Sequence, residues 1–437
     1  MNESLLPNDF VERMLDRLDP VRPQPLAEHL QPVHVMYGGA DLFKPDTFDK
    51  LRMRALRIME QNVGDEDSFD AVFATGSLTA DVYAKTVNKL RSEPIEDYRI
   101  DFEDGFGIRP DEEEDAAARS AASALSELVA SGNAVRLTGI RPKAFNAATL
   151  ERGLRTLEIF VSTLHAGLGR LPEGFVITLP KVASPVEPVI LADTLNEIED
   201  RLGIERGSTP VELMFETPEF QAAPDGVLAF RRMVDACGGR CRGVHFGAYD
   251  LLASLGVSAE SQRLDHPSCV SARAAMLTSL AGTGVWLSDG ATTEMPVGRH
   301  RKADLTEAET AENRADVAKA LRAHYLNCRR SLVEGFYQSW DLHPGQLIAR
   351  YAAVQTFFIE GRDRSAARLR NFIDRGTRAT MTGSTFDDAA TGQGLLNFFR
   401  RGIRCGAFTS EEATGLTSVT AEEFAAGSFA HILARRA

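Results

Sequence analysis

The sequence has little cysteine, no excess of basic residues and no long apolar run. Its five cysteines are Cys237, Cys241, Cys269, Cys328 and Cys405. An odd number of cysteines in a long chain argues against a disulfide framework and indicates reduced thiols. The chain carries 49 Lys and Arg residues against 62 Asp and Glu residues, which gives a net charge of −13. This balance argues against nucleic acid or an anionic membrane as the main partner, since either needs a basic face.

Sequence motifs of several other protein classes are also missing. No stretch reaches the roughly 18 consecutive apolar residues of a transmembrane helix. The first 20 residues include several acids and no apolar run of signal-peptide length, so we expect a cytoplasmic protein. The GxxxxGK phosphate loop and the GxSxG elbow do not occur, which argues against a nucleoside triphosphatase and a serine hydrolase.

Short apolar runs alternate with longer helical patterns between residues 30 and 345. The eight runs begin at Val33, Tyr98, Ala134, Phe175, Val211, Gly243, Val285 and Phe336. Most are rich in Val, Ile, Phe or Tyr, as buried strands are. Eight strands that alternate with helices predict an α/β fold of the TIM (β/α)8 barrel type, because a doubly wound sheet usually stops at about five to seven strands.

Two parts of the chain depart from this alternation. A long inserted segment, about residues 45–95, separates the first two runs, and an extended loop, LSDGATTEMPVGRH, follows the seventh. We expect both to act as lids or pocket walls. Beyond residue 358 the pattern is helical only. The sequence therefore predicts a barrel domain over residues 1–357 and a helical C-terminal appendage over residues 358–437.

Ionisable side chains accompany seven of the eight predicted strands. They are Asp101, Glu103, Asp104, Arg136, Lys181, Glu216, Asp250, Asp289 and His343. A TIM barrel gathers the carboxyl ends of its strands on one face, where the chemistry of such enzymes takes place. A purely structural protein has no reason to collect acids there, because desolvating several carboxylates together is costly without a cation.

The excess of acids at these positions predicts a metal ion. Carboxylates from two different strands, with water in the remaining positions, suit Mg²⁺, with Mn²⁺ as the alternative. Glu216 and Asp250 are the best pair, because each follows a well-defined strand and lies beside Gly or Pro residues that shape the turn. The alternative, that both acids cap the following helices, stays open at this point.

Six segments carry a family resemblance. They are IDFEDG, VRLTG, LPKV, MFETPEF, FGAYDLLASLG and DLHPGQL, in this order over residues 33–350. In sequence and spacing they resemble motifs of the HpcH/HpaI aldolase and citrate lyase beta-subunit family. The resemblance implies a phosphoenolpyruvate/pyruvate-binding TIM barrel, usually Mg²⁺-dependent, that cleaves or forms carbon–carbon bonds beside a carbonyl.

The resemblance also implies roles for individual residues. Glu216 and Asp250 match the family's metal ligands, and Arg136 matches the arginine that holds the substrate's carboxylate or carbonyl oxygen. Glu103 and Asp104 match acids that orient metal-bound water and that arginine. Negative charge develops on an oxygen when such a bond is cleaved, and a divalent cation and a planar guanidinium both stabilise it.

Three further positions are candidate site residues, and each also has another explanation. The segment around Asp388 loosely resembles a tail of the acyl-CoA lyase branch, in which an aspartate acts as an acid/base group. Asp388 matches that aspartate by position, with Asp387 as the second choice. The alternative is that the aspartate is the N-cap of the following helix. Lys181 has the position of a Schiff-base lysine, but beside a metal pair we expect an ion pair with neighbouring acids and contact with substrate. His343 either touches the substrate or fixes the turn after the last strand.

These observations predict a Mg²⁺-dependent carbon–carbon lyase or aldolase that acts on a small oxo-acid or an acyl-CoA-type substrate. One alternative is a condensing acyltransferase similar to malate synthase, and another is a barrel that binds a metabolite without turnover. The resemblance also implies a homotrimer or homohexamer. Leu395, Leu396, Phe398 and Phe399 would offer the apolar face for that assembly.

Overall fold

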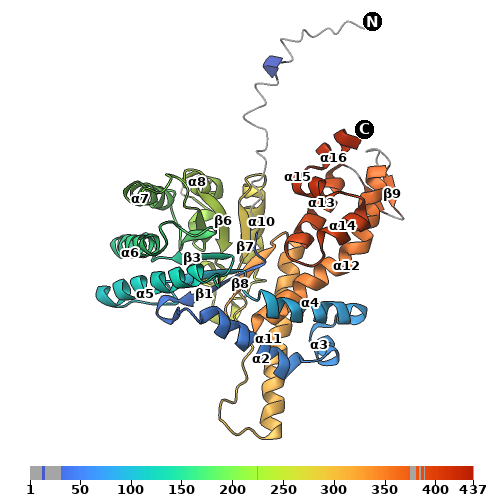
Figure 1. Ribbon diagram of the computed structural model, residues 1–437, viewed down its shortest axis with the longest axis horizontal. Helices are drawn as coiled ribbons and strands as arrows, with labels where there is room; N and C mark the ends of the chain where they lie inside the picture. Colours follow the sequence, from blue (N-terminus) through green and yellow to red (C-terminus); the bar gives the residue numbers. More distant parts are fainter. Residues whose placement is uncertain are drawn as a thin grey trace.

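Eight parallel strands close into a barrel in chain order, with β8 paired to β1. The computed structural model describes residues 12–14, 31–223, 225–374, 380–382, 385–387 and 389–436. The barrel strands are β1 (His34–Gly39), β2 (Asp97–Asp101), β3 (Leu137–Arg141), β4 (Phe175–Leu179), β5 (Val211–Phe215), β6 (Cys241–Phe246), β7 (Trp286–Asp289) and β8 (Gln338–Asp341). Helices surround this barrel, and more helices follow it in the chain (Figure 1). The predicted TIM barrel with a helical C-terminal part is confirmed.

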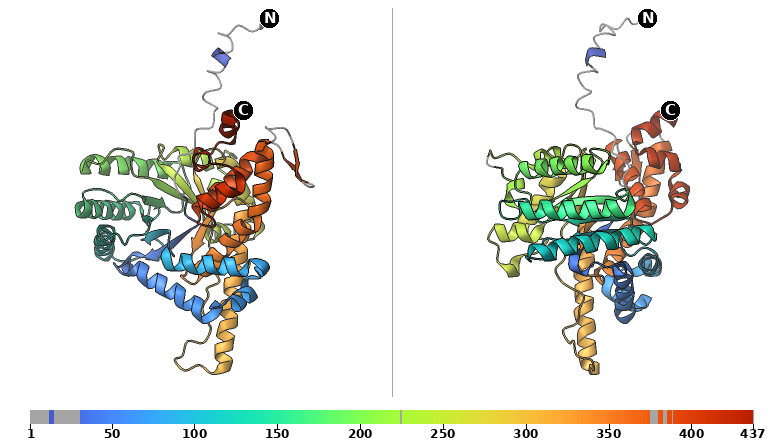
Figure 2. Two further views of the ribbon diagram at one scale, coloured as in Figure 1. Left: turned by 45° about the vertical axis from the view of Figure 1, so that its right-hand side comes forward. Right: turned by 60° about the vertical axis from the view of Figure 1, so that its left-hand side comes forward.

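Helices connect the strands and cover the outside of the barrel. Those that lie before the end of the barrel are α2 (Thr47–Val63), α3 (Glu66–Phe73), α4 (Thr79–Ser92), α5 (Asp111–Ala130), α6 (Leu150–Leu168), α7 (Val186–Leu202), α8 (Phe230–Asp235), α9 (Ala248–Ser254), α10 (Pro267–Leu280) and α11 (Glu307–Val333). The predicted insertion after β1 contains α2, α3 and α4. Figure 2 shows that α11 projects beyond the barrel, with the loop that follows β7 beside it.

Strand β2 alternates between an apolar outer face and a polar inner face. On β2, Ile100 points outward and is fully buried under the helices, whereas Asp97 and Arg99 point into the barrel. The inward direction is shown by Arg99, whose guanidinium bonds Thr178 on β4 and Glu212 on β5. The period of two that a strand imposes therefore separates an apolar core outside the barrel from a polar interior.

Strand β3 begins three residues later and ends two residues later than the sequence predicts. The predicted run starts at Ala134 and ends at Gly139, but the strand continues through Gly139 to Arg141. A Cβ atom at position 139 would lie 2.1 Å from the carbonyl oxygen of Val176 on β4. Glycine is therefore needed here for close approach of two strands, and it does not mark a turn.

The C-terminal part begins with one continuous helix. Helix α12 runs from Gln346 to Asp374, so the predicted boundary at residues 357 and 358 falls inside it. After it come β9 (Thr380–Thr382), β10 (Thr385–Asp387), α13 (Ala389–Arg404), α14 (Ser410–Thr417), α15 (Ala421–Ala426) and α16 (Phe429–Arg436). These C-terminal helices lie beside the barrel, on the side where the N-terminal ends of the strands are found (Figures 1 and 2).

The apolar residues of α13 pack within the chain. Leu396 and Phe399 are fully buried, and Leu395 is nearly so. The ring of Phe398 lies 5.2 Å from that of Phe358 on α12, measured between centroids. Leu395, Leu396 and Phe399 are therefore covered by this chain's own helices and do not offer the predicted apolar face, whereas Phe398 is half-buried; the oligomeric state stays a prediction.

Buried ion pairs join β8 to the outer helices. Asp341 points outward, and its carboxylate accepts hydrogen bonds from His324 on α11 and Arg350 on α12. Burial alone would lower the pKa of His324, but the neighbouring Cys328 and the bond to Asp341 raise it to about 9. None of the five cysteines forms a disulfide. Over the described ranges, no helix combines the length and apolar character needed to span a bilayer.

Candidate active site at the mouth of the barrel

Charged side chains from neighbouring strands meet at the C-terminal end of the barrel, which we call the mouth. They are Asp101 at the end of β2, Glu103 and Asp104 in the loop after it, Arg141 at the end of β3, Lys181 after β4, Glu216 after β5 and Asp250 on α9. This is the end at which TIM-barrel enzymes carry their active sites.

Arg141 is the arginine of the mouth, and Asp101 holds it in place. Its Nε donates to Asp101 Oδ1 at 2.7 Å and its Nη2 donates to Oδ2 at 2.5 Å, which is a bidentate pair. The guanidinium also lies over the ring of Tyr37, 4.9 Å from the centroid. Burial alone would lower the pKa of Arg141, but Asp101 raises it, so this side chain keeps its charge although it is only 4% exposed. Two planar contacts therefore fix the fork in one orientation.

Arg136, which the sequence analysis placed in the site, lies at the other end of the barrel. It precedes β3, and its Nη2 lies 3.1 Å from Glu93 and 3.5 Å from Glu96, which stands just before β2. The predicted position is therefore wrong. The physical reason is the glycine inside β3: with the strand ending at Arg141 instead of Gly139, the arginine delivered to the mouth is Arg141.

Glu216 and Asp250 lie close enough to perturb each other. Glu216 is 1% exposed, and its Oε1 accepts a hydrogen bond from the backbone N–H of Lys181. Burial, reinforced by the Asp250 carboxylate, raises the pKa of Glu216 to about 8. A Cβ atom at position 247 would lie 2.3 Å from the Cβ of Glu216, so Gly247 makes room for this side chain.

The helix-cap alternative for these two acids does not match the geometry. Asp250 stands in the first turn of α9, whose N-cap is Gly247 and whose cap makes no side-chain hydrogen bond. The 3-10 helix after Glu216 begins at Pro218 with Thr217 as its N-cap. Neither carboxylate therefore serves as a helix cap, and Asp250 lies close enough to act on the charge of Glu216.

Lys181 forms the predicted ion pairs. Its Nζ donates to Glu103 Oε1 and to Asp104 Oδ1, both at 2.8 Å. Burial raises the pKa of Glu103 to about 6. Although burial opposes it, hydrogen bonds with Glu103 and Lys181 lower the pKa of Asp104 to about 2. The backbone of Lys181 has a φ of +52°, a strained conformation for a residue with a side chain, and it directs the N–H towards Glu216.

The other predicted residues lie apart from this group. His343 accepts a hydrogen bond from the backbone N–H of Gly345, so it does fix the turn after β8. Burial and the nearby Arg54 lower its pKa to about 4. Asp289 bonds Ser331 on α11 and so faces the outer helices. Asp388 lies outside the described residues.

The donor set at the mouth fits a hard divalent cation. Burial and the neighbouring Asp250 carboxylate both raise the pKa of Glu216. A cation bound between these two carboxylates would relieve their repulsion. Two buried polar atoms beside this group, Tyr37 Oη and Glu103 Oε2, have no hydrogen-bond partner. Among the residues described, no three His, Cys, Asp or Glu side chains are arranged to hold a metal, so water or substrate would complete the coordination.

The family model described as "Domain of unknown function (DUF6986)" matches residues 24–432. The chain belongs to this family. No curated protein matches the DUF6986 chain.

Solved structures share its fold at low identity. A citrate lyase from Burkholderia xenovorans LB400 is 18% identical, with a TM-score of 0.56, and the match covers 90% of this chain and 99% of that one. A Haloferax volcanii malate synthase, in a lead(II) complex, is 12% identical, with a TM-score of 0.50 and coverage of 91% and 99%. At these identities the likeness shows the fold alone, and the chemistry has to be argued from this chain's own residues.

The barrel interior beneath the mouth holds charged residues that the sequence analysis missed. The Arg99 guanidinium pairs with Asp97 and with Glu212, and Glu212 in turn contacts His245 on β6 at 2.9 Å. Trp340 on β8 donates to His245 and lies 4.6 Å from the Tyr37 ring, which stacks under Arg141. We call this set the charged column. The signal was present in the sequence, because Asp97, Arg99 and Asp101 alternate at the period of a strand.

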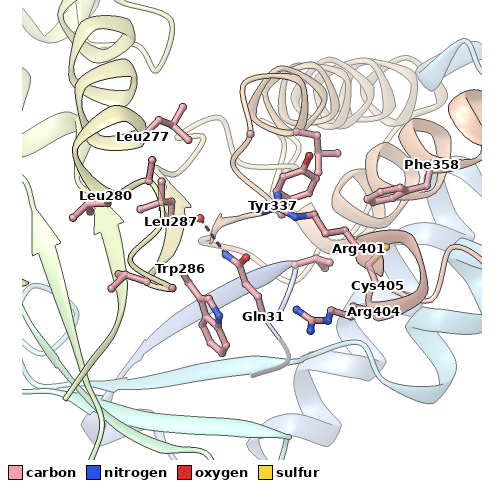
Figure 3. A pocket seen from close by; sticks show the side chains of 17 residues that line it. Gln31, Leu277, Leu280, Trp286, Leu287, Tyr337, Phe358, Arg401, Arg404 and Cys405 are labelled. Atoms are coloured by element: carbon pink, nitrogen blue, oxygen red, sulfur yellow. Dashed lines mark hydrogen bonds between the residues drawn. The ribbon is translucent and has the colours of Figure 1, made fainter. Parts of the chain in front are cut away.

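A cavity lies at the end of the DUF6986 barrel opposite the mouth (Figure 3). Its volume is about 300 Å³, and residues from the start of β7, from α10 and from α13 line it, including Trp286, Leu280 and Arg401. Arg401 lies over the Tyr337 ring, 3.5 Å from the centroid, and burial lowers the pKa of Arg401. The cavity is separated from the mouth by the barrel, so it is not part of the candidate active site.

Proposed function

We propose that this DUF6986 chain is a Mg²⁺-dependent enzyme that cleaves or forms a carbon–carbon bond beside a carbonyl of a small oxo-acid or acyl thioester. The observation that carries the proposal is the fixed Arg141 fork beside the paired carboxylates Glu216 and Asp250. Asp101 takes Nε and Nη2, whereas Nη1 makes only weaker contacts, with Met214 Sδ at 3.7 Å and with Asp104 at 3.6 Å, which a ligand carboxylate could replace. A guanidinium held in this way suits the carboxylate of an oxo-acid.

Glu216 and Asp250 would hold the Mg²⁺ ion, with Mn²⁺ as the alternative metal. The bound cation would supply positive charge beside the substrate oxygen on which negative charge develops. Arg141 would bind and orient the substrate from the neighbouring strand. Glu103, with a pKa of about 6, is the carboxyl group suited to exchange a proton near neutral pH. Lys181 would keep Glu103 and Asp104 in place by its two hydrogen bonds.

The first test is the metal site. Replacing Asp250 by Asn removes one negative charge and keeps the shape of the side chain. We expect the affinity for Mg²⁺, measured by isothermal titration calorimetry, to fall at least tenfold, about 1.4 kcal/mol, because a hard cation prefers an ionised oxygen. The metal-free variant should be at least as stable as the parent, since the repulsion with Glu216 is removed.

The matched control is Asp235→Asn, an exposed acid of α8 that pairs with Arg231 on the surface. This control should bind Mg²⁺ as the parent does. If Asp250→Asn also binds Mg²⁺ with parental affinity, the metal site is not at Glu216 and Asp250. Activity is then measured in both directions: release of pyruvate or acetyl-CoA from hydroxy-acid substrates, and condensation of acetyl-CoA with glyoxylate, which tests the malate-synthase-like alternative.

A further inference from the structure

A large open groove beside the mouth is lined by basic side chains. Its volume is about 1210 Å³, and it lies between α2, the loop after β7 and α11. We call it the basic groove. Its cationic and imidazole lining residues are Lys50, Arg54, Arg57, His300, Arg301, Arg314 and His343, and its lining contains no Asp or Glu.

Most of these cations are not neutralised by the protein. Over the described ranges, the exposed side chains of Arg54, Arg57, Arg301 and Arg314 form no ion pair with a carboxylate. Elsewhere on the surface, exposed arginines commonly do, as in the pair of Arg201 with Glu197. The chain has 62 acids and a net charge of −13, so a groove with several free guanidinium groups is a marked local reversal of charge. Such a concave positive surface attracts anions.

The positions of these side chains follow from the helix period. Lys50, Arg54 and Arg57 are spaced by four and three residues on α2, which places them on one face of the helix. The opposite wall is the loop that carries Arg301. It is pinned to α11, because the side chain of Asn313 bonds both the backbone N–H and the carbonyl oxygen of His300. The groove is therefore built before any ligand arrives.

The groove adjoins the candidate active site. His343, one of its lining residues, lies two residues after the C-terminal end of β8, and its Nε2 is buried without a hydrogen-bond partner. At the same turn, a Cβ on Gly345 would lie 2.7 Å from Pro296 and 3.1 Å from Ile58, so the loop, α2 and the rim of the barrel meet here. The groove therefore borders the rim of the barrel next to β8, at the end of the barrel that carries the mouth, although it shares no lining residue with the charged group there.

We propose that the basic groove binds a phosphate-bearing anion with more than one negative charge. Guanidinium forks match phosphate oxygens in pairs, and several of them around one open volume suit two or more phosphate groups. Such a group has two sources: the phosphorylated end of the substrate whose reacting end lies at the mouth, or a separate phosphorylated metabolite. The first source rests on the proposed function, whereas binding of the phosphate group itself does not.

The test is calorimetric titration of the full chain with inorganic pyrophosphate and with ADP, in the absence of any substrate. We expect both to bind, more weakly as KCl is raised from about 50 to 300 mM, because exposed charges are screened. The double variant Arg54→Gln/Arg57→Gln should weaken both affinities at least tenfold. The matched control is Arg52→Gln on the same helix, whose side chain pairs with Asp49 and does not line the groove; it should change them less than twofold.

Equal affinities in the double variant and the parent, or no binding of either probe at about 10 mM, would overturn the proposal. A parallel titration with acetyl-CoA separates the two sources. If Arg54→Gln/Arg57→Gln and Asp250→Asn each weaken acetyl-CoA binding, whereas Asp250→Asn leaves ADP binding unchanged, the groove holds the phosphorylated end of the substrate. If Asp250→Asn changes neither, the groove serves a separate ligand. If pyrophosphate binds and Asp250→Asn leaves the Mg²⁺ affinity unchanged, the proposal for the groove stands and the proposed metal site is rejected.

Discussion

Replacing Arg141 by lysine keeps a positive charge in the mouth but removes the planar fork. In the parent, Nε and Nη2 bond the two oxygens of Asp101 at 2.7 and 2.5 Å, and the guanidinium lies 4.9 Å from the centre of the Tyr37 ring. A lysine ammonium can keep one contact with Asp101, but it cannot make the parallel pair and stack on the ring at the same time.

The size of the effect follows from those contacts. Losing one charge-assisted hydrogen bond in a buried place costs about 1.5–3 kcal/mol. Losing part of the contact with the Tyr37 ring adds about 0.5–1 kcal/mol. We therefore expect Arg141→Lys to lower the free energy of unfolding by about 2–4 kcal/mol, and to weaken the binding of an oxo-acid such as pyruvate more than tenfold.

The assay is urea unfolding followed by circular dichroism, together with calorimetric titration of pyruvate at saturating Mg²⁺. Arg136→Lys is the matched control, because that guanidinium is 30% exposed and its ion pairs lie at the far end of the barrel. We expect this control to change stability by less than about 1 kcal/mol and not to change pyruvate binding. The reasoning is refuted if the two variants are equally stable, or if only Arg136→Lys weakens pyruvate binding.

Two further predictions concern the scaffold. Gly139→Ala should lower the free energy of unfolding, measured in urea, by about 1–3 kcal/mol, because its Cβ would lie 2.1 Å from the Val176 carbonyl oxygen. The control Gly394→Ala, at a position with open space around it, should not be destabilising. The pKa of about 9 at His324 means that its charged pairing with Asp341 stabilises the fold fully below pH 6.5 and is lost as the pH rises through 9. The difference in melting temperature between the parent and His324→Gln should therefore shrink between pH 6 and pH 10, and a constant difference would contradict this.

The barrel could be predicted because each strand is a short run of apolar residues between helical patterns. The closeness of Glu216 and Asp250 was expected from the same pattern, since Glu216 directly follows β5 and Asp250 stands in the first turn of the helix after β6; their role as metal ligands stays a prediction. Lys181 also forms the ion pairs that were expected from the acids around it. These features depend on local sequence and on the rule that parallel strands end at one face.

What could not be predicted depends on contacts between distant segments. A run that ends in Thr138-Gly139 is typical of a strand that stops, and nothing in the sequence shows that β4 passes so close to position 139. The choice between Arg136 and Arg141 turns on that single contact. Similarly, Leu396 and Phe399 are apolar enough for an interface, and only the three-dimensional packing shows that both are already buried within the chain.

The charged column has a consequence for how strictly the strands must be aligned as the chain folds. If β2 or β5 shifted by one residue against its neighbours, Arg99 or Glu212 would turn outward into the apolar layer beneath the helices, and Ile100 or Leu213 would face the charges inside. Each misaligned form would bury charges without partners, which is far more costly than misplacing an apolar side chain. The charges inside the barrel therefore make every misaligned pairing of β2 or β5 much less stable than the native one, and so help to fix the register of the strands.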